Sequence, residues 1–364
     1  MSDLSLAAIA ETVIEIDARE RFPYSTQVRF SQRFPEAERA FFSAPFDWTW
    51  PTRVYCLRDV VYDPATGAIY KDGLLVADCR NNPDALQSIE HCSPDTLITM
   101  PSDRWVVIGA HRHSGLYYHF VISDLPALVW GSIEAKRIGD FQLLLPALRP
   151  FQRSYLDFYG LAPAPRVEAA EGKLYHLPQA VFSDFHLGSN LFQISTATRR
   201  LFAYGRHRAP DAATPPRLYI SRRDTSHRHV RNETLLYELL QKYGYVAVEL
   251  AGLSLETQIA MFRNAQSVVA PHGGGLTNLV YATRGAQVLE LFTEGWLNPC
   301  YNVIAKSVQM DYWADVSPAT PEAGGLQAHM IVDIDRCTEL LEEMHARQRS
   351  QERFELIESG PPLI

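Results

Sequence analysis

The sequence has few cysteines and no long apolar run. Five cysteines occur in 364 residues, an odd number, and no two of them form a Cys-x-x-Cys pair. Disulfide frameworks and zinc sites need closely spaced pairs, so neither is predicted and no metal is expected. The most apolar later stretch, Tyr117 to Trp130, is interrupted by Asp124 and Pro126. It falls short of the ~20 apolar residues that span a bilayer.

The N-terminus lacks the features of a secretory leader. It carries Asp3, Glu11 and Glu15 instead of a basic start, and its apolar stretch Leu4–Ala10 is short. With free thiols also predicted, a cytoplasmic location is expected. Docking onto a membrane surface stays open.

Five aromatic residues are expected either in the core or in a homo-oligomer contact: Phe41, Phe42, Phe46, Trp48 and Trp50.

Positive charge is scarce overall but concentrated in one stretch. The net charge of −8 argues against general nucleic-acid binding, which needs a basic surface to displace phosphate counterions. From Arg199 to Arg231, however, there are nine arginines and only two acids, Asp211 and Asp224. This stretch is either a solvated face or a local anion site, for which a nucleotide diphosphate is the natural small ligand.

A proline-containing stretch divides the chain. Pro210, Pro215 and Pro216 follow Gly205 closely, so residues 206–216 are predicted to be a linker. Residues 1–205 then form an N-terminal domain, residues 217–330 a Rossmann-like C-terminal domain, and residues 331–364 a closing helix and tail. Short β-rich elements are predicted in the N-terminal domain: Val54–Leu57, Val60–Tyr62 and Leu74–Ala77.

Strands and helices alternate regularly after the linker. This alternation predicts an α/β fold with a parallel sheet, whose carboxyl edge is where ligands bind. The predicted strands are Leu218–Ile220, Tyr245–Leu250, Ser267–Ala270 and Val288–Phe292. The predicted helices are Asn232–Tyr243, Ser254 to about Asn264, Leu276–Tyr281 and Asp335 to about Arg349.

One of the strand-to-helix turns is stripped of side chains. Three consecutive glycines would let backbone N–H groups approach a ligand closely and adopt positive φ, and the helix start adds unpaired donors. The alternatives are a pyrophosphate site and a tight turn that only packs a helix on a strand. The candidate phosphate-binding residues are His272, Gly273, Gly274, Gly275, Leu276, Thr277 and Asn278.

A second turn is basic. Ser221, Arg222 and Arg223 follow the first strand of the C-terminal domain, and Arg231 stands at the next helix start. Guanidinium groups bind phosphate bidentately, so the two turns together predict a diphosphate clamp. The alternative is that Arg222 or Arg231 pairs with Asp224 or Glu233 at the surface. Glu290, at the end of a later strand, is expected to accept from ribose hydroxyls or to be a plain surface carboxylate.

Three blocks carry a family resemblance. They are Tyr117-Tyr118-His119-Phe120 with Leu125-Pro126, then Pro150-Phe151-Gln152-Arg153, and the long run from Leu218 to Tyr312 that includes both turns and Glu290-Leu291-Phe292. From about residue 50 onward the chain resembles glycosyltransferase family 61, and most of all its bacterial members tied to surface polysaccharide assembly.

The resemblance implies a fold and an activity. It implies a GT-B fold, in which two Rossmann-like domains face across a cleft. The C-terminal domain would hold a nucleotide sugar, for which a UDP-sugar is expected, and the N-terminal domain a carbohydrate-type acceptor. It further implies transfer with inversion at the anomeric carbon and without an obligate metal.

His119 is the candidate general base, because a neutral imidazole can take the proton of the acceptor hydroxyl. The alternative is a buried histidine that hydrogen-bonds a helix terminus. Asp124 is the second candidate, either as base or as the group that orients the imidazole. Ser123 stands where the family usually has an acid and Ala127 where it usually has arginine, so the acceptor side differs from the family pattern.

Two other functions remain open on the residues alone. A phosphate-ester or pyruvyl-type transferase would use the same anion clamp on a similar scaffold. A non-catalytic nucleotide- or carbohydrate-binding subunit would keep the clamp and lose turnover, which the departures at Ser123 and Ala127 would allow.

Overall fold

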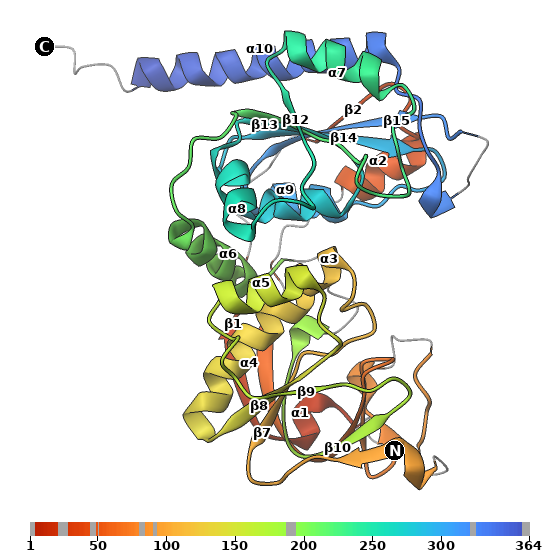
Figure 1. Ribbon diagram of the computed structural model, residues 1–364, viewed down its shortest axis with the longest axis vertical. Helices are drawn as coiled ribbons and strands as arrows, with labels where there is room; N and C mark the ends of the chain where they lie inside the picture. Colours follow the sequence, from red (N-terminus) through yellow and green to blue (C-terminus); the bar gives the residue numbers. More distant parts are fainter. Residues whose placement is uncertain are drawn as a thin grey trace, which may run out of the picture. The chain divides into compact units, whose positions relative to one another are not determined.

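The computed structural model describes residues 4–20, 28–43, 49, 51–79, 84–89, 93–186, 194–320 and 325–358. They divide into two compact α/β units, the first formed by described residues within 1–23 and 46–209 and the second by those within 24–45 and 210–364 (Figure 1). The division falls inside the stretch 206–216 that the sequence predicts as a linker. Helix α6 (Thr196–Arg208) nevertheless continues through the first three residues of that stretch.

The sheet of the first unit is mixed. Its strand order is β5-β4-β3-β10-β7-β8-β9, with β1 added against β3 and β6 against β10. β3 runs antiparallel to β1, β4 and β10, whereas β7 is parallel to β8 and β10. The strands are β1 (Ala10–Asp17), β3 (Thr52–Asp63), β4 (Ala68–Lys71), β5 (Leu74–Leu75), β6 (Leu97–Thr99), β7 (Trp105–Ile108), β8 (Phe141–Leu145), β9 (Arg166–Glu168) and β10 (Leu174–Ser183).

β3 differs from its prediction. The two strands expected over Val54–Leu57 and Val60–Tyr62 are one continuous strand, in which Asp59 adopts φ 47°. The third expected strand is shorter than predicted and is β5. The helices of this unit are α1 (Leu6–Ile9), α3 (Tyr117–His119), α4 (Leu125–Ile138), α5 (Pro150–Phe158) and α6.

A glycine on each element lets α4 lie close to β7. A Cβ on Gly131 of α4 would stand 2.9 Å from Cγ1 of Val107, and one on Gly109, just after β7, would stand 2.3 Å from Cδ2 of Leu128. Between α3 and α4, residues Phe120–Asp124 form a π-helical turn. Such turns insert an extra residue into a helix and are frequent at functional sites.

The sheet of the second unit is parallel throughout. Its strand order is β12-β11-β13-β14-β15-β2. α7 and α10 cover one face, and α8, α9 and α2 cover the other (Figure 1). The strands are β2 (Val28–Phe30), β11 (Arg217–Ile220), β12 (Val246–Val248), β13 (Ser267–Pro271), β14 (Gln287–Thr293) and β15 (Asp311–Ser317). The helices are α2 (Glu36–Ser43), α7 (Glu233–Lys242), α8 (Leu255–Asn264), α9 (Cys300–Ser307) and α10 (Ile334–Glu358).

The predicted alternation of strands and helices is confirmed from β11 to β14. The sequence analysis missed α9 and β15, which follow, and β12 is shorter than the strand expected over Tyr245–Leu250. In the described part of the chain, every helix is too short or too polar to cross a membrane.

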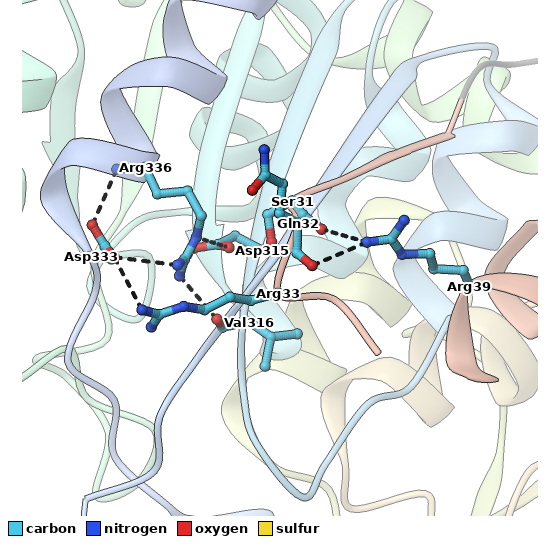
Figure 2. A network of polar contacts seen from close by, with 8 residues as sticks. All are labelled: Ser31, Gln32, Arg33, Arg39, Asp315, Val316, Asp333 and Arg336. Atoms are coloured by element: carbon cyan, nitrogen blue, oxygen red, sulfur yellow. Dashed lines mark hydrogen bonds and ion pairs between the residues drawn. The ribbon is translucent and has the colours of Figure 1, made fainter. Parts of the chain in front are cut away.

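A segment from near the N-terminus completes the second unit. The sequence predicts one N-terminal domain over residues 1–205, but β2 pairs in parallel with β15 and so places residues 28–43 in the second unit. Polar contacts hold this segment (Figure 2). Arg39 donates to the carbonyl groups of Ser31 at 3.0 Å and Gln32 at 3.3 Å, and Arg33 pairs with Asp333 at 3.8 Å.

A buried ion pair ties α10 to β15 beside this segment (Figure 2). Arg336 donates to both carboxylate oxygens of Asp315, at 2.7 and 3.1 Å, and to the carbonyl of Val316 at 3.1 Å. Asp315 is fully buried. The bidentate geometry compensates the cost of taking its charge out of water.

Aromatic rings also bind the segment to the sheet. The rings of Phe34 and Phe42 lie 5.1 Å apart, and that of Phe42 lies 5.6 Å from Phe292 on β14. Phe42 is fully buried and Phe41 is 46% exposed. Phe42 is therefore a core residue of the second unit. The other three aromatic residues expected in a core or subunit contact, Phe46, Trp48 and Trp50, lie outside the described residues.

Candidate functional site

Two loops leave the carboxyl edge of the second unit's sheet side by side. One follows β11 and begins at Ser221, and the other follows β13 and begins at His272. β11 and β13 are hydrogen-bonded neighbours that run parallel, so both loops start at the same edge. The chain continues from β11 to β12 on one side and then returns past β11 to β13. The position between β11 and β13 is therefore the topological switch point, where sheets of this kind bind ligands.

Arg222 lies directly against Gly273. A Cβ on Gly273 would stand 1.7 Å from Nη1 of Arg222 and 2.8 Å from its Cζ, so any side chain there would displace the guanidinium group. Gly273 has φ 173°, an extended conformation open to any residue, and neither Gly274 nor Gly275 adopts a left-handed φ. The prediction of positive φ in this run is wrong. Close approach of Arg222 is the reason for glycine at 273.

Arg222 is a buried cation. It is 9% exposed, and burial, followed by the neighbouring Arg228, lowers its pKa to about 10. Its Nε donates to the carbonyl of His227 at 3.2 Å. Across the described residues, no carboxylate forms an ion pair with it. An unpaired buried charge is costly, so a bound anion would stabilise this arrangement.

Arg228 is a second cation at the same place, and the sequence analysis missed it. Its backbone has φ 57°, which is rare outside glycine. Its Nε is buried without a hydrogen-bond partner in the described part of the chain. Its charge acts on both Arg222 and Tyr301. The excess of arginines between residues 199 and 231 was the sequence signal that could have pointed to it. Only the fold shows which of these nine arginines lies beside Arg222.

Histidines hold the basic loop in shape. Nε2 of His229 donates to the carbonyl of Thr225 at 2.6 Å, and the backbone N–H of His229 donates to Nδ1 of His329 at 3.0 Å. The backbone N–H of Met330 donates in turn to the carbonyl of His229 at 2.9 Å. The segment before α10 thus holds the basic loop after β11 in position.

The other predicted residues of the basic turn do not join Arg222. Ser221 donates to Glu233 at 2.7 Å, and Arg223 pairs with the same carboxylate at 2.5 Å. The expected surface pairing with Glu233 therefore occurs, but through Arg223. Arg231 is exposed, and its backbone N–H donates to Met330 at 2.8 Å.

The glycine run opens a short helical segment, Gly274–Tyr281, that is a 3₁₀-helix. Its first N–H groups have no partner within the helix and stand where an anion could accept from them. Leu276 and Thr277 are fully buried within the unit. Asn278 donates to Gln258 at 2.9 Å and so joins this segment to α8. Contact of Leu276, Thr277 or Asn278 with a phosphate stays a prediction.

His272 is held by a buried carboxylate. Its Nδ1 forms a short hydrogen bond with Oε1 of Glu290, whose Oε2 accepts from the hydroxyl of Tyr312 at 2.5 Å. The imidazole stacks on Phe292, with ring centres 5.1 Å apart, and contacts Tyr301. Glu290 is fully buried. Both of its carboxylate oxygens form hydrogen bonds with side chains of this unit. It is therefore neither the surface carboxylate nor the ribose acceptor that the sequence predicts.

In the first unit, His119 is a neutral imidazole with an unoccupied nitrogen. Burial, and to a lesser extent His113, lowers its pKa to about 4. Its Nδ1 has no hydrogen-bond partner among the residues described. The ring of His113 lies 4.9 Å away. The expected alternative, a histidine bonded to a helix terminus, is not what these contacts show.

Asp124 belongs to a different histidine. It is fully buried, and its Oδ1 lies 3.5 Å from Nδ1 of His186, whose Nε2 donates to Ile108 at 2.9 Å. An acceptor hydroxyl cannot reach a side chain with no exposure, and Asp124 makes no hydrogen bond to His119. The geometry fits neither role predicted for Asp124, because the π-helical turn directs it into the core. Ser123 and Ala127 are buried as well.

α5 supports the helix that carries His119. Gln152 is fully buried, accepts from the backbone N–H of Arg149 at 2.6 Å and donates to the carbonyl of Ser114 at 2.9 Å. The ring of Phe151 packs 5.2 Å from that of Tyr117. The block Pro150-Phe151-Gln152-Arg153 therefore fixes the segment before His119. No group of three or more histidine, cysteine or acidic side chains in the described ranges is arranged to hold a metal ion.

The helix with His119 and both loops at the switch point lie between Tyr117 and Leu289. Residues 117–289 match the family model Glycosyltransferase 61. The matched segment thus takes in His119, Arg222, Arg228 and His272, and ends one residue before Glu290.

A named relative agrees with this match. The chain is 28% identical over 189 residues to the EGF domain-specific O-linked N-acetylglucosamine transferase of Drosophila melanogaster. That alignment covers 46% of this chain and 36% of the relative, so the chain spans little more than a third of that protein. Both similarities are to glycosyltransferases.

Proposed function

We propose that the chain is an inverting glycosyltransferase that moves a sugar from a nucleotide-sugar donor, a UDP-sugar, to a carbohydrate-type acceptor in the assembly of a bacterial surface polysaccharide. A GT-B arrangement belongs to this proposal, with the second unit binding the donor and the first unit the acceptor.

One observation carries the proposal. Arg222 is buried against Gly273 at the switch point, with Arg228 beside it, and neither guanidinium has a carboxylate partner in the described part of the chain. Two cations that form no ion pair with a described residue, beside a loop that lacks side chains, are suited to a diphosphate, because guanidinium groups form charge-assisted hydrogen bonds with phosphate oxygens.

The proposed reaction is a single displacement. The acceptor oxygen attacks the anomeric carbon, the bond from that carbon to the diphosphate oxygen breaks, and the acceptor proton passes to His119. A positioned base supplies about 10²- to 10⁴-fold in rate. Arg222 and Arg228 stabilise the charge that develops on the departing diphosphate, and preorganised charges of this kind usually supply the largest share of catalysis.

Thermal unfolding with nucleotides and nucleotide sugars tests the donor site. A ligand that binds only the folded chain stabilises it by about 2.7 kcal/mol at one hundred times its Kd, so a diphosphate donor should raise the Tm. UDP-N-acetylglucosamine is the first donor to test, because the named relative transfers N-acetylglucosamine. The Arg222→Ala variant should lose the shift. If wild-type protein shows no shift with any nucleotide diphosphate, the proposal fails.

Nucleotide release distinguishes the proposed reaction from the two alternatives. A glycosyltransferase releases free nucleotide from a nucleotide sugar in an acceptor-dependent way, which a phosphate-ester or pyruvyl-type transferase does not. Binding without release across a broad panel of glycan acceptors would instead favour a non-catalytic binding subunit.

A further inference from the structure

A buried carboxylate binds one of the two ring nitrogens of His272. It follows β13, and Glu290 and Phe292 lie on the neighbouring strand β14. Side chains alternate between the faces of a strand, so Glu290, Phe292 and the ring of His272 share the face opposite the core residues Leu289 and Leu291. The side chain of His272 is 7% exposed.

The contacts of Glu290 fix the tautomer of His272. A carboxylate oxygen accepts hydrogen bonds, and Oε2 of Glu290 already accepts from Tyr312 at 2.5 Å. Oε1 therefore accepts from Nδ1 of His272, which must carry a proton. In a neutral imidazole Nε2 then bears the lone pair, and the only hydrogen bond of the ring to a described residue is the one at Nδ1. A lone pair repels a phosphate oxygen, whereas an N–H group donates to it.

Several ionisable groups lie around His272 and the adjoining basic loop. Burial raises the pKa of Cys300 and Tyr301 on α9 and of Tyr312 on β15 well above their usual values, so these three groups are neutral. The charged groups at this place are then the carboxylate of Glu290, the guanidinium groups of Arg222 and Arg228 in the β11 loop, and the carboxylate of Asp224, whose charge acts on Arg222. Negative charge placed beside an imidazole favours its protonated form, and a bound diphosphate would supply such charge.

We propose that His272 takes up a proton at Nε2 when a nucleotide-linked diphosphate binds, and that Glu290, backed by Tyr312, is the positioning residue that makes this possible. The inference rests on the proposed function, since it assumes that the clamp binds a diphosphate. The proton comes from solvent and forms the Nε2–H bond. Glu290 holds the ring through Nδ1, so the new N–H donates to the ligand, and the proton returns to solvent when the ligand leaves.

Calorimetric titration with UDP-N-acetylglucosamine at pH 7.5 tests the inference. This probe is a diphosphate diester that does not itself titrate near neutral pH, so any proton exchanged belongs to the protein. Repeating the titration in buffers of different ionisation enthalpy gives the number of protons taken up. We expect net uptake approaching one proton per ligand, and an affinity that falls by up to about tenfold per pH unit as the pH rises.

Three variants define the residues responsible. Glu290→Gln should lose most of the proton uptake, because an amide cannot offset the imidazolium charge, and His272→Asn should lose all of it. Glu294→Gln is the matched control: Glu294 is exposed just beyond β14, and its variant should titrate like the wild type.

The outcomes separate the two proposals. Tight binding by the wild type without proton uptake overturns this inference and leaves the proposed function intact. If UDP-N-acetylglucosamine does not bind at all, the clamp fails and this inference fails with it. Should Glu290→Gln not fold, nitrogen-15 NMR of the wild-type complex decides. Both ring nitrogens of His272 must be protonated in the complex, and a neutral ring contradicts the inference.

Discussion

At the scale of single residues, the candidate donor site depends on one close contact. Arg222 occupies the space that a Cβ at position 273 would take. Glycine and arginine therefore act as a pair across neighbouring loops. The pair explains why a loop with an ordinary extended conformation at Gly273 still needs glycine.

The Gly273→Ala variant should bind nucleotide diphosphate about 10- to 100-fold more weakly, because displacing Arg222 removes charge-assisted hydrogen bonds of ~1.5–3 kcal/mol. Calorimetric titration measures the change. Gly252→Ala is the control, since a Cβ there meets nothing within 4 Å. Equal affinities of the two variants would show that Arg222 does not contact the ligand.

The His119→Ala variant should retain nucleotide affinity and lose about 10²- to 10⁴-fold in turnover, the usual contribution of a general base. Steady-state release of nucleotide and direct titration separate the two effects. His207→Ala removes an exposed histidine of α6 and should behave as the wild type. Unchanged turnover in His119→Ala would rule out the base assignment.

At this scale the sequence singled out residues whose own chemistry is unusual for their position, and their role in binding a ligand stays a prediction. Arg222 and the glycine run were identified because guanidinium groups and missing side chains have few other uses in a strand-to-helix turn. Glu290 and Asp124 were given roles that the structure does not support. Their roles depend on which residue of a neighbouring element they face, and one sequence carries no record of that.

At the scale of elements, the histidines after β7 link folding to pH. The rings of His111 and His186 lie 5.6 Å apart, and His113 is next to both His111 and His119. Burial lowers the pKa of His111 to about 4, as it does that of His119. Asp124 is the acid that faces this cluster.

Acidification from pH 7 to pH 5 should therefore destabilise the protein. In the unfolded chain a histidine has a pKa of about 6.5. The unfolded state therefore binds more protons than the folded state between pH 4 and pH 6.5. Stability rises with pH across this window, by at most about 1.4 kcal/mol per pH unit for each histidine, and levels off above it.

Denaturant unfolding at several pH values measures this slope. His111→Gln should flatten it, and His207→Gln, at an exposed site, should not. Parallel slopes in all three proteins would show that the buried histidines do not control acid stability.

The missed elements have a physical explanation. β15 carries two aspartates, which are uncommon in strands, so its sequence gives no strand pattern. Asp315 is compensated by Arg336 and Asp311 by Arg347, both on α10. The strand exists because a helix formed later in the chain supplies the counter-charges.

At the scale of the whole chain, the second unit is built from two distant parts of the sequence. β2 adds the last strand to its sheet, and Lys306 and Asn302 of α9 donate to the carbonyl of Phe42 at 3.0 and 2.7 Å. The ring of Phe42 packs against Phe292, which stacks on His272. The N-terminal segment, residues 28–43, therefore packs against the residues that position His272 in the candidate donor site.

The Phe42→Ala variant should lower the free energy of unfolding by about 3–5 kcal/mol, because it leaves a cavity among buried rings. This loss of stability should appear in the thermal unfolding transition whose Tm a nucleotide diphosphate raises. The neighbouring Phe41→Ala is a matched control, since Phe41 is 46% exposed, and should change stability by less than about 1 kcal/mol. Equal effects would mean that the segment does not contribute to the core of the second unit.

The sequence by itself determined the α/β class, the strands and helices from β11 to β14, and the pairing of a basic turn with a glycine turn, and it placed a linker at residues 206–216, within which the two units divide. These features follow from local periodicity and from the chemistry of single residues. Only the tertiary structure decided that Arg222 fills the place of a side chain at Gly273, that Arg228 joins it, that Glu290 holds His272 and that residues 28–43 belong to the second unit. Each of these is a contact between residues far apart in the chain, and such contacts exist only once the strands have paired.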